Sequence, residues 1–461
     1  MYYQSGLFSR SSFLNYLVMN KKVALHTLGC KLNFSESSTI GNQFLLNDFE
    51  IVDSKEKADV YLFNTCTVTE SAEKECRQLI RRALRINPDA YIIVTGCYAQ
   101  LRPEEISKIE GVDAVIGSNE KFNLFSILDN FNKSNLACIY VGELDDIAKF
   151  GEAHSTDADA RTRAYFKIQD GCDYKCSFCT IPFARGKSRS MDPKLAVEEF
   201  TKLVDEGYKE IILTGVNVGD YGKAFDINLR TLLSEFVKIK GDFRIRISSI
   251  EPNLLTPEII DLIAAEKKLC NHLHIPLQSG NPEILKSMQR RYNLNEFENI
   301  LLKAHEQISD LGIGVDVIVG FPGETEDNFI DTHNFLRDLP ISYLHVFTYS
   351  ERPGTKAIDL DGKVEIAERK RRNKILRILS EKKKHQFYQR MIGKEVQILF
   401  EQENLNGIMR GFTSNYVRVT GNYEVAQINK LTPFVILGLN DNGLCEGKFI
   451  DTKNSVELIS L

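Results

Sequence analysis

Three apolar runs in the amino-terminal part of the chain each end at a cysteine. They cover residues 23–30, 60–66 and 91–97, and a more polar stretch of helical pattern follows each of them. Apolar runs of this length are typical of strands that are buried on both faces. Repeated strand–helix units predict a parallel sheet over residues 21–145, with the carboxyl ends of its strands on one edge.

Six further strand candidates follow between residues 165 and 355, and most of the intervals between them have a helical pattern. Eight strand–helix units close a full barrel, so six units predict a partial barrel that is open on one side. We assign this (β/α)6 barrel to residues 146–385, and its open side would admit a large substrate. The strand candidates end near Gln169, Gly215, Ile250, Leu277, Gly320 and Tyr349.

The pattern of the chain changes after Gly393. Short alternating runs at 395–400, 416–419 and 434–437 are separated by glycine and asparagine turns. This pattern predicts a small, OB-like β-barrel over residues 386–461. The expected fold class is therefore α/β, with a parallel-sheet domain, a partial barrel and a small carboxyl-terminal β-barrel.

Composition favours an intracellular enzyme. The 461 residues are 43% hydrophobic and 26% charged, with a net charge of -5 and ten cysteines. Ten cysteines are too sparse for a disulfide scaffold, and no signal peptide with a cleavage site precedes them. We expect a cytoplasmic protein without a membrane span. Residues 1–20 predict a disordered leader, or a translation start at Met19 instead of Met1.

The segment GCDYKCSFC at residues 171–179 places three thiols in one CxxxCxxC loop. Three thiolates are one fewer than a fully ligated four-iron, four-sulfur cluster requires, so one iron would stay open. A zinc knuckle or a disulfide loop is the alternative, but zinc would require a fourth ligand nearby, and the next histidine is His272. The spacing favours a 4Fe-4S cluster on Cys172, Cys176 and Cys179.

This loop, with an aromatic residue directly before its last cysteine, resembles the signature of radical S-adenosylmethionine (SAM) enzymes. The resemblance implies that the open iron binds the amino and carboxylate groups of SAM. It also implies that one electron passes into the sulfonium, which releases a 5′-deoxyadenosyl radical. Because the cofactors would carry the chemistry, we expect no catalytic side chain.

The three strand-end cysteines are candidates for a second metal site. Parallel strands end on one edge, so Cys30, Cys66 and Cys97 are expected to converge there. Buried free cysteines also pack well as small hydrophobic side chains, and packing is the alternative. The other four cysteines lack partner spacing and are assigned to packing: Cys76, Cys138, Cys270 and Cys445.

The segments LGCKLN at 28–33, NTCTVT at 64–69 and TGCYAQ at 95–100 resemble the amino-terminal domain of the methylthiotransferases. With the radical SAM loop, this resemblance covers nearly the whole chain. It implies that Cys30, Cys66 and Cys97 hold an auxiliary 4Fe-4S cluster that supplies sulfur. The carboxyl-terminal β-barrel likewise resembles the TRAM domain, an RNA-binding module. We further expect a monomer that receives electrons from a reductant protein such as flavodoxin or ferredoxin.

Polar and glycine-rich sequence follows several barrel strands, where a barrel enzyme places its site. Glycine would let the backbone approach SAM, and small polar side chains would bond its ribose and carboxylate. The alternative is that these residues only turn the chain. Arg185 and Arg189, just past the cysteine loop, either pair with an anion or are solvated. The candidate SAM contacts are Gly215, Asn217, Ser249, Glu251, Gln278, Ser279 and Gly320.

A basic helix is predicted at 363–390, where eleven lysines and arginines stand against three acidic residues. Such an excess suggests a polyanionic partner, because phosphates attract clustered cations, and a solvated helix face is the alternative. Residues 386–461 hold seven basic and eight acidic residues. RNA binding would then depend on a few residues such as Arg410 and Arg418, or on the basic helix.

The amino-terminal LGCKLN segment points to tRNA as the substrate. It looks most like the family branch that adds a methylthio group at carbon 2 of N6-threonylcarbamoyladenosine beside the anticodon. The related branches modify isopentenyladenosine in tRNA or an aspartate of a ribosomal protein. They usually have Gln-Met-Asn or Pro-Lys-Asn after the first cysteine, whereas this chain has Lys-Leu-Asn at 31–33. A non-enzymatic iron–sulfur RNA-binding protein is the alternative of another class.

Overall fold

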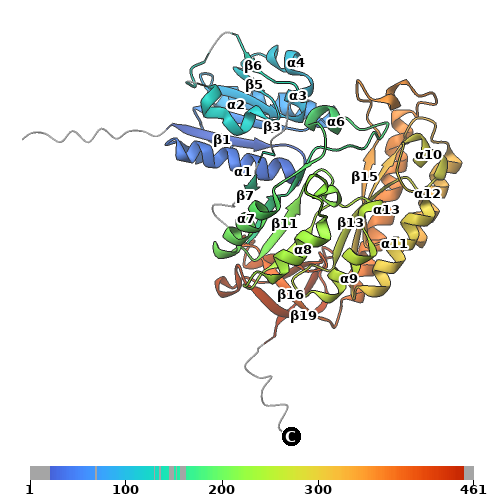
Figure 1. Ribbon diagram of the computed structural model, residues 1–461. Coiled ribbons are helices and arrows are strands. Elements are labelled where there is room, and N and C mark those ends of the chain that lie inside the picture. The colour runs from blue at the N-terminus through green and yellow to red at the C-terminus, as the bar shows by residue number, and fades with distance from the viewer. Residues whose placement is uncertain are drawn as a thin grey trace, which may run out of the picture.

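The computed structural model describes residues 21–67, 70–128, 130–133, 136–144, 150–151, 153–155 and 162–450. The predicted leader lies outside these residues, and the predicted domain boundaries stay predictions. Figure 1 shows an amino-terminal sheet with its helices at the top, a barrel of strands and helices in the middle, and the carboxyl-terminal strands at the bottom. In the part of the chain that the structure describes, no helix has the length and apolar character that a membrane crossing requires.

The amino-terminal sheet is parallel throughout, as predicted, with the strand order β2-β1-β3-β4-β5-β6. β3 and β4 are buried along their whole length, which explains their continuous apolar sequence. The strands are β1 (Lys22–Thr27), β2 (Glu50–Val52), β3 (Val60–Thr65), β4 (Tyr91–Gly96), β5 (Ala114–Ile116) and β6 (Cys138–Tyr140). The helices are α1 (Lys31–Leu46), α2 (Glu70–Ile86), α3 (Cys97–Leu101), α4 (Pro103–Ser107), η1 (Glu120–Asn123) and α5 (Leu124–Ile127).

The central part is a partial barrel of six parallel strands, which confirms the prediction. Its strands form two sheets, β12-β11-β8-β7 and β13-β14-β15, which are joined by two isolated parallel bridges between β12 and β13. The short β7 (His154–Ser155) is antiparallel at one edge. The six strands are β8 (Arg163–Lys167), β11 (Glu210–Thr214), β12 (Arg244–Ile247), β13 (His272–Gln278), β14 (Gly312–Val319) and β15 (Tyr343–Thr348).

Helices between these strands cover the outside of the barrel. Their apolar faces and the strands form one continuous core, in which residues such as Phe200, Phe236 and Leu301 are fully buried. The helices are α7 (Pro193–Asp205), α8 (Leu229–Lys238), α9 (Pro257–Ala265), α10 (Pro282–Ser287), α11 (Leu294–Gln307), α12 (Glu326–Asp338) and α13 (Ile366–Arg390). The last of these is the predicted basic helix.

The carboxyl-terminal part is a closed five-stranded β-barrel, as predicted, with the strand order β16-β17-β18-β20-β19. The sequence pattern missed β17 and β20, because glycine and charged residues interrupt their alternation. Its core contains buried aromatic side chains such as Phe400 and Phe434. The strands are β16 (Glu395–Phe400), β17 (Ile408–Thr413), β18 (Arg418–Asn422), β19 (Leu431–Leu439) and β20 (Cys445–Phe449).

Glu210 on β11 links the two barrels. Its carboxylate accepts hydrogen bonds from Arg244 Nε at 2.6 Å and from Arg246 Nε at 2.8 Å, and all three side chains are buried. The same arginines donate to the backbone carbonyls of Phe412 at 2.8 Å and Ser414 at 2.8 Å. They therefore neutralise Glu210 and also hold the turn after β17 against the central barrel.

Candidate active site

The three strand-end cysteines lie at the carboxyl ends of adjacent strands. Cys30 follows β1 at the start of α1, Cys66 follows β3, and Cys97 opens α3 directly after β4. Because β1, β3 and β4 are neighbours in the sheet, the predicted convergence of these strand ends is confirmed. Cys30 and Cys97 are close enough for their charges to interact. Their role as metal ligands stays a prediction.

Two glycines allow this close approach. Gly29 has a φ of 106°, and a Cβ there would lie 2.7 Å from Cys66 Cβ and 3.1 Å from Cys66 Sγ. Gly96 has a φ of 93° and a ψ of −166°, and a Cβ there would lie 2.4 Å from the carbonyl oxygen of Thr65. Other residues neither adopt this backbone conformation readily nor fit the space. The glycines therefore leave room for the thiols to face one another.

Arg185 joins the cysteine loop to the amino-terminal sheet. It ends α6 (Ile181–Arg185), which contacts α3, and its side chain is buried. Its Nε donates to Cys97 Sγ at 3.3 Å, and its Nη2 donates to Asn33 Oδ1 at 2.7 Å. Of the two alternatives for this arginine, the structure shows pairing rather than solvation.

A buried charge network surrounds Arg185. Lys121 Nζ lies 2.6 Å from Glu36 Oε2, and Arg185 Nη1 lies 2.8 Å from Glu36 Oε1. Burial alone would raise the pKa of Glu36 and Asp170, but the neighbouring cations outweigh it and hold both below their ordinary values. Among the described residues, this network has four cations and two carboxylates. Anionic thiolates beside Arg185 would offset the excess of positive charge. Its members are Glu36, Lys121, Lys167, Asp170, Arg185 and Arg189.

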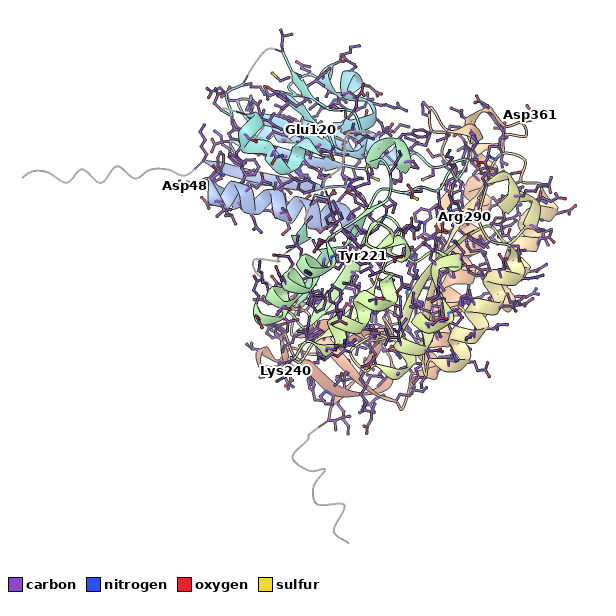
Figure 2. The ribbon with its side chains drawn as sticks, viewed as in Figure 1. Asp48, Glu120, Tyr221, Lys240, Arg290 and Asp361 are labelled. Atoms are coloured by element: carbon purple, nitrogen blue, oxygen red, sulfur yellow. The ribbon has the colours of Figure 1, made fainter. Side chains whose placement is uncertain are left out.

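The loop cysteines lie between β9 (Gln169–Asp170) and α6. The charges of Cys172 and Cys176 both act on Cys179, so the three thiols are close together. Arg290 Nη1 donates to Cys176 Sγ at 3.0 Å, and its guanidinium also pairs with Glu251. Figure 2 shows Arg290 in the central barrel, apart from Glu120 in the amino-terminal sheet region. Each triad therefore has one buried arginine that donates to one of its thiols.

Burial keeps two thiols of the loop protonated unless a metal ion binds them. Burial raises the pKa of Cys172 to about 11 and that of Cys179 to about 12. Such thiols are protonated at neutral pH and are poor nucleophiles, whereas a bound metal ion replaces the proton. All ten cysteines are free thiols, which disfavours the disulfide alternative. The residues present therefore fit two iron–sulfur clusters, each with three cysteine ligands.

Three of the four remaining cysteines pack in the core, as predicted: Cys76, Cys270 and Cys445 are buried. The same prediction is wrong for Cys138, which is exposed. Cys138 lies on β6, the edge strand of the sheet, and all three residues of this strand are exposed. An edge strand has a neighbour on one side only, so its side chains are less covered.

Asn217 and Gln278 have the strongest structural support among the candidate SAM contacts. Asn217 is buried, and neither its Oδ1 nor its Nδ2 has a hydrogen-bond partner among the described residues. Buried polar atoms of this kind usually bind water or a ligand. Gln278 has a φ of 71° and lines a cavity beside the cysteine loop. Both features are compatible with a polar cofactor, and the role of these two residues as SAM contacts also stays a prediction.

The other five candidate SAM contacts have partners within the protein that account for them without a cofactor. Their role as SAM contacts stays a prediction. Glu251 pairs with Arg290, Ser249 bridges to His274, Ser279 bonds to Thr332, Gly215 packs on Gln169, and Gly320 packs on Arg369.

A cavity of about 240 Å³ opens beside the cysteine loop, and Cys179, Asp316 and Phe347 are among the residues that line it. The Asp316 carboxylate lies 2.7 Å from His274 Nε2 and 3.4 Å from His345 Nδ1. Sequence reasoning missed this group, because its members come from three different strands and share no local motif. The cavity has room for part of a planar ligand against its apolar and aromatic side chains.

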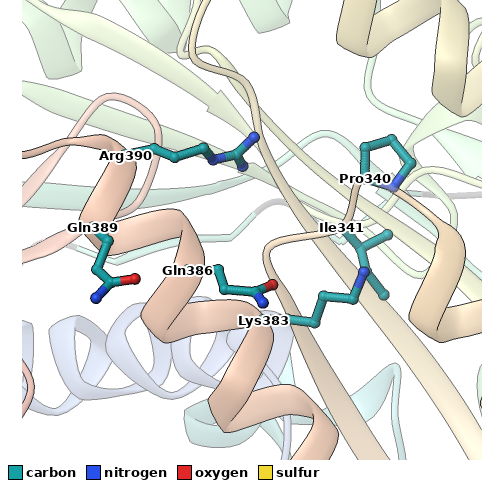
Figure 3. Close-up of a pocket in the computed structure, with 6 residues that line it drawn as sticks. All are labelled: Pro340, Ile341, Lys383, Gln386, Gln389 and Arg390. Carbon is teal, nitrogen blue, oxygen red and sulfur yellow. The ribbon is translucent and has the colours of Figure 1, made fainter.

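A second hollow, of about 510 Å³, lies between α13 and the turn before β15. Figure 3 shows Lys383 and Arg390 extending from α13 toward Pro340 and Ile341. Lys383 Nζ donates to two backbone carbonyls, those of Arg337 at 2.5 Å and Leu339 at 2.6 Å. No cysteine lines this hollow, so it is not the candidate active site.

Comparison with protein families defines the class of the protein. A model of the radical SAM superfamily matches residues 166–336, which contain the CxxxCxxC loop and most of the barrel. A model described as uncharacterized protein family UPF0004 matches residues 22–117, which contain Cys30, Cys66 and Cys97. The fold, the loop and these matches together define a radical SAM enzyme with an additional amino-terminal three-cysteine region.

Relatives identify the family within this class. Threonylcarbamoyladenosine tRNA methylthiotransferase MtaB of Bacillus subtilis is 40% identical over 421 residues, 90% of this chain and 93% of the relative. The protein of the same name from Aquifex aeolicus is 40% identical over 86% of this chain and 96% of the relative. The chain therefore belongs to the MtaB-type family of radical SAM methylthiotransferases, as its sequence predicted. Enzymes of this family use SAM and two 4Fe-4S clusters, and the protein does so too.

The fold also matches a solved structure. The radical SAM methyltransferase TsrM of Kitasatospora setae, with cobalamin and a [4Fe-4S] cluster bound, aligns with a TM-score of 0.55 at 15% identity. The alignment covers 74% of this chain and 77% of TsrM. At this identity the likeness shows the fold alone.

Proposed function

We propose that the protein adds a methylthio group at carbon 2 of N6-threonylcarbamoyladenosine beside the anticodon of tRNA. One observation carries this proposal. Four MtaB proteins are 36–40% identical to the chain over 86–90% of its length. Four tRNA-2-methylthio-N(6)-dimethylallyladenosine synthases are 32–33% identical. The higher identity supports the threonylcarbamoyl substrate over the dimethylallyl substrate, and the names of all eight relatives refer to tRNA rather than to a ribosomal protein.

The two thiol triads would hold the two clusters. Cys172, Cys176 and Cys179 would hold the cluster that binds SAM, and Cys30, Cys66 and Cys97 would hold the auxiliary cluster. When bound, these groups supply the radical chemistry and the sulfur, so no side chain needs to act as a general base. The chain orients the triads, since Arg185 lies only six residues after Cys179 and bonds to Cys97.

The proposal includes the partners of the reaction. tRNA would be the macromolecular substrate, bound through cationic side chains. Arg418 is one candidate for this contact, and its guanidinium lies 5.4 Å from the ring centre of Phe412. A reductant protein such as flavodoxin or ferredoxin would supply electrons to a monomeric, cytoplasmic enzyme.

The test is mass spectrometry of tRNA nucleosides after an anaerobic reaction with reconstituted enzyme. We expect the wild type to convert threonylcarbamoyladenosine to its 2-methylthio form and to release 5′-deoxyadenosine. Cys97→Ala should keep 5′-deoxyadenosine release and lose sulfur insertion, whereas Cys176→Ala should lose both. Cys138→Ala, which removes an exposed cysteine outside both triads, should keep both.

Two results would contradict the proposal. Equal loss in both assays for Cys97→Ala and Cys176→Ala would argue against two separate clusters. Modification of dimethylallyladenosine or of a ribosomal protein, with threonylcarbamoyladenosine unchanged, would argue against the substrate.

A further inference from the structure

Tyr416 stands at a point where three parts of the chain meet. It lies in the turn between β17 and β18, and its φ of 68° is unusual for so large a side chain. Its ring centre lies 4.7 Å from that of His272 and 6.2 Å from that of Tyr343, both on barrel strands. Lys31 Nζ, from α1, lies 5.8 Å from the same ring centre. Such backbone strain occurs most often at functional sites.

The cations around this ring have anionic partners, except for Lys31. Arg246 lies 5.0 Å from the ring centre and pairs with Glu210, and Arg163 pairs with Glu401. Within the described residues no carboxylate lies within ion-pair distance of Lys31. The charges of Glu210 and Asp316 act on it only from farther away, and its ammonium lies over the tyrosine ring. A partly enclosed ammonium without an ion-pair partner is unfavourable. An anion would therefore bind favourably beside the Lys31 ammonium.

A row of rings leads from this point to the cavity beside the cysteine loop. The ring centre of Tyr343 lies 5.3 Å from that of His345, which lies 4.9 Å from that of His274. Both histidines contact Asp316, which lines the cavity. A base in the cavity could therefore extend a substituent along this row toward Lys31.

We propose that Lys31 binds the carboxylate of the threonylcarbamoyl group and thereby selects this substrate. The proposal rests on the proposed function, because it takes threonylcarbamoyladenosine as the substrate. The dimethylallyl group of the related substrate is an uncharged hydrocarbon and offers Lys31 no anion. The carboxylate supplies the anion that Lys31 lacks. The neighbouring rings of Tyr343 and Tyr416 reduce the access of water, which strengthens an ion pair.

The test uses anticodon stem-loops that differ only in the substituent of one base. The first carries threonylcarbamoyladenosine, the second carries its neutral carboxamide analogue, and the third carries dimethylallyladenosine. Binding to anaerobic holoenzyme is measured by fluorescence anisotropy without reductant, so no turnover occurs. We expect the wild type to bind the carboxylate form about tenfold more tightly than the carboxamide form, as for one charge-assisted hydrogen bond.

Variants of Lys31 separate its charge from its size. Lys31→Met keeps an unbranched side chain of nearly the same length without the ammonium group, and should bind the carboxylate and carboxamide forms equally. Lys31→Arg should keep most of the preference. The matched control is Lys55→Met, which removes an exposed lysine of the amino-terminal sheet region and should keep the preference unchanged. Iron content and 5′-deoxyadenosine release without tRNA check that each variant keeps its clusters.

Either of two results would overturn the proposal: equal binding of both forms by the wild type, or an unchanged preference in a cluster-loaded Lys31→Met. Should Lys31→Met lose its clusters, Lys31→Arg tests the residue instead, and equal binding of both forms by the wild type would still overturn the proposal. The proposed function fails in a different way, which is preferential binding and modification of the dimethylallyl stem-loop by the wild type.

Discussion

Gly96 places Cys97 because it has no side chain. Its φ of 93° and ψ of −166° fall in a region that is almost exclusive to glycine, and a Cβ would lie 2.4 Å from the Thr65 carbonyl oxygen. Gly96→Ala should therefore lower the free energy of unfolding by about 3 kcal/mol. It should also shift Cys97 and reduce the iron content from about eight to about four per chain. Urea unfolding and iron analysis measure the two effects.

Gly207 provides the control for this substitution. It has a similar φ of 94°, but no heavy atom lies within 4 Å of a Cβ built there. Gly207→Ala should cost about 1–2 kcal/mol for the backbone conformation alone and should keep the full iron content. Equal unfolding free energies and equal iron contents for the two variants would show that the contact with Thr65 does not matter.

At the scale of residues, the sequence predicted the features that a local pattern of residues encodes. The triad of Cys30, Cys66 and Cys97 was predictable, because each residue marks the end of an apolar run and parallel strands end on one edge. The arginine donors Arg185 and Arg290 were not predictable as donors. Their partners lie 88 and 114 residues away in the chain, and no spacing rule connects such pairs.

At the scale of elements, strand β11 is tied to the carboxyl-terminal barrel through Glu210. Glu210→Gln would leave Arg244 and Arg246 buried without their counter-ion, which costs about 3–5 kcal/mol in comparable buried pairs. Urea unfolding of the apoprotein at pH 7 measures this cost. The control is Glu401→Gln at the same junction, where the partly exposed pair with Arg163 should contribute about 1 kcal/mol or less.

The contribution of Glu210 to the free energy of unfolding should decrease as the pH falls. Burial raises its pKa, but Arg244 and Arg246 outweigh burial and hold the pKa well below the ordinary value. A carboxyl group with a lowered folded-state pKa stabilises the folded state fully at pH values above its unfolded-state pKa of about 4.3. This stabilisation is lost as the pH falls from there through the folded-state pKa. The difference between wild type and Glu210→Gln should therefore be constant from pH 6 to 8 and shrink below about pH 4. A difference that grows on acidification would contradict this assignment.

The elements that sequence predicted best are those with a long, consistent period. The basic helix expected at 363–390 matches α13, and the strand expected at 395–400 matches β16. β17 was missed because glycine and arginine interrupt its alternation. The pairing of β12 with β13 through two isolated bridges could not be predicted either, because backbone contacts between sheets leave no periodic signal in the side chains.

At the scale of the whole molecule, the three parts were predictable but their contacts were not. Strand count and period distinguish a parallel sheet, a partial barrel and a small β-barrel. The approach of Lys31 to Tyr416 joins residues 385 positions apart and depends on how all three parts pack. The substrate-selecting site proposed above is therefore a property of the assembled chain, although its lysine stands beside a predicted cysteine.

The basic helix α13 leads to a prediction about tRNA binding by the whole molecule. Two of its cations serve the fold, since Arg369 and Arg372 are buried and pair with glutamates. Lys370, Lys374 and Arg377 are exposed, and their spacing of four and three residues places them on one face of the helix. Each cation that contacts a phosphate releases counter-ions on binding. Replacing all three by alanine should lower the slope of log affinity against log salt by about 2–3.

The control removes the same charge elsewhere, from the exposed Lys238, Lys240 and Lys267. This triple variant keeps the net charge equal to that of the α13 variant, so a general electrostatic effect would weaken tRNA binding equally in both. Fluorescence anisotropy of labelled tRNA at several salt concentrations distinguishes the two. A slope that falls only in the α13 variant would place phosphates along this helix, and equal slopes in both variants would assign the eight excess charges of residues 363–390 to a solvated face.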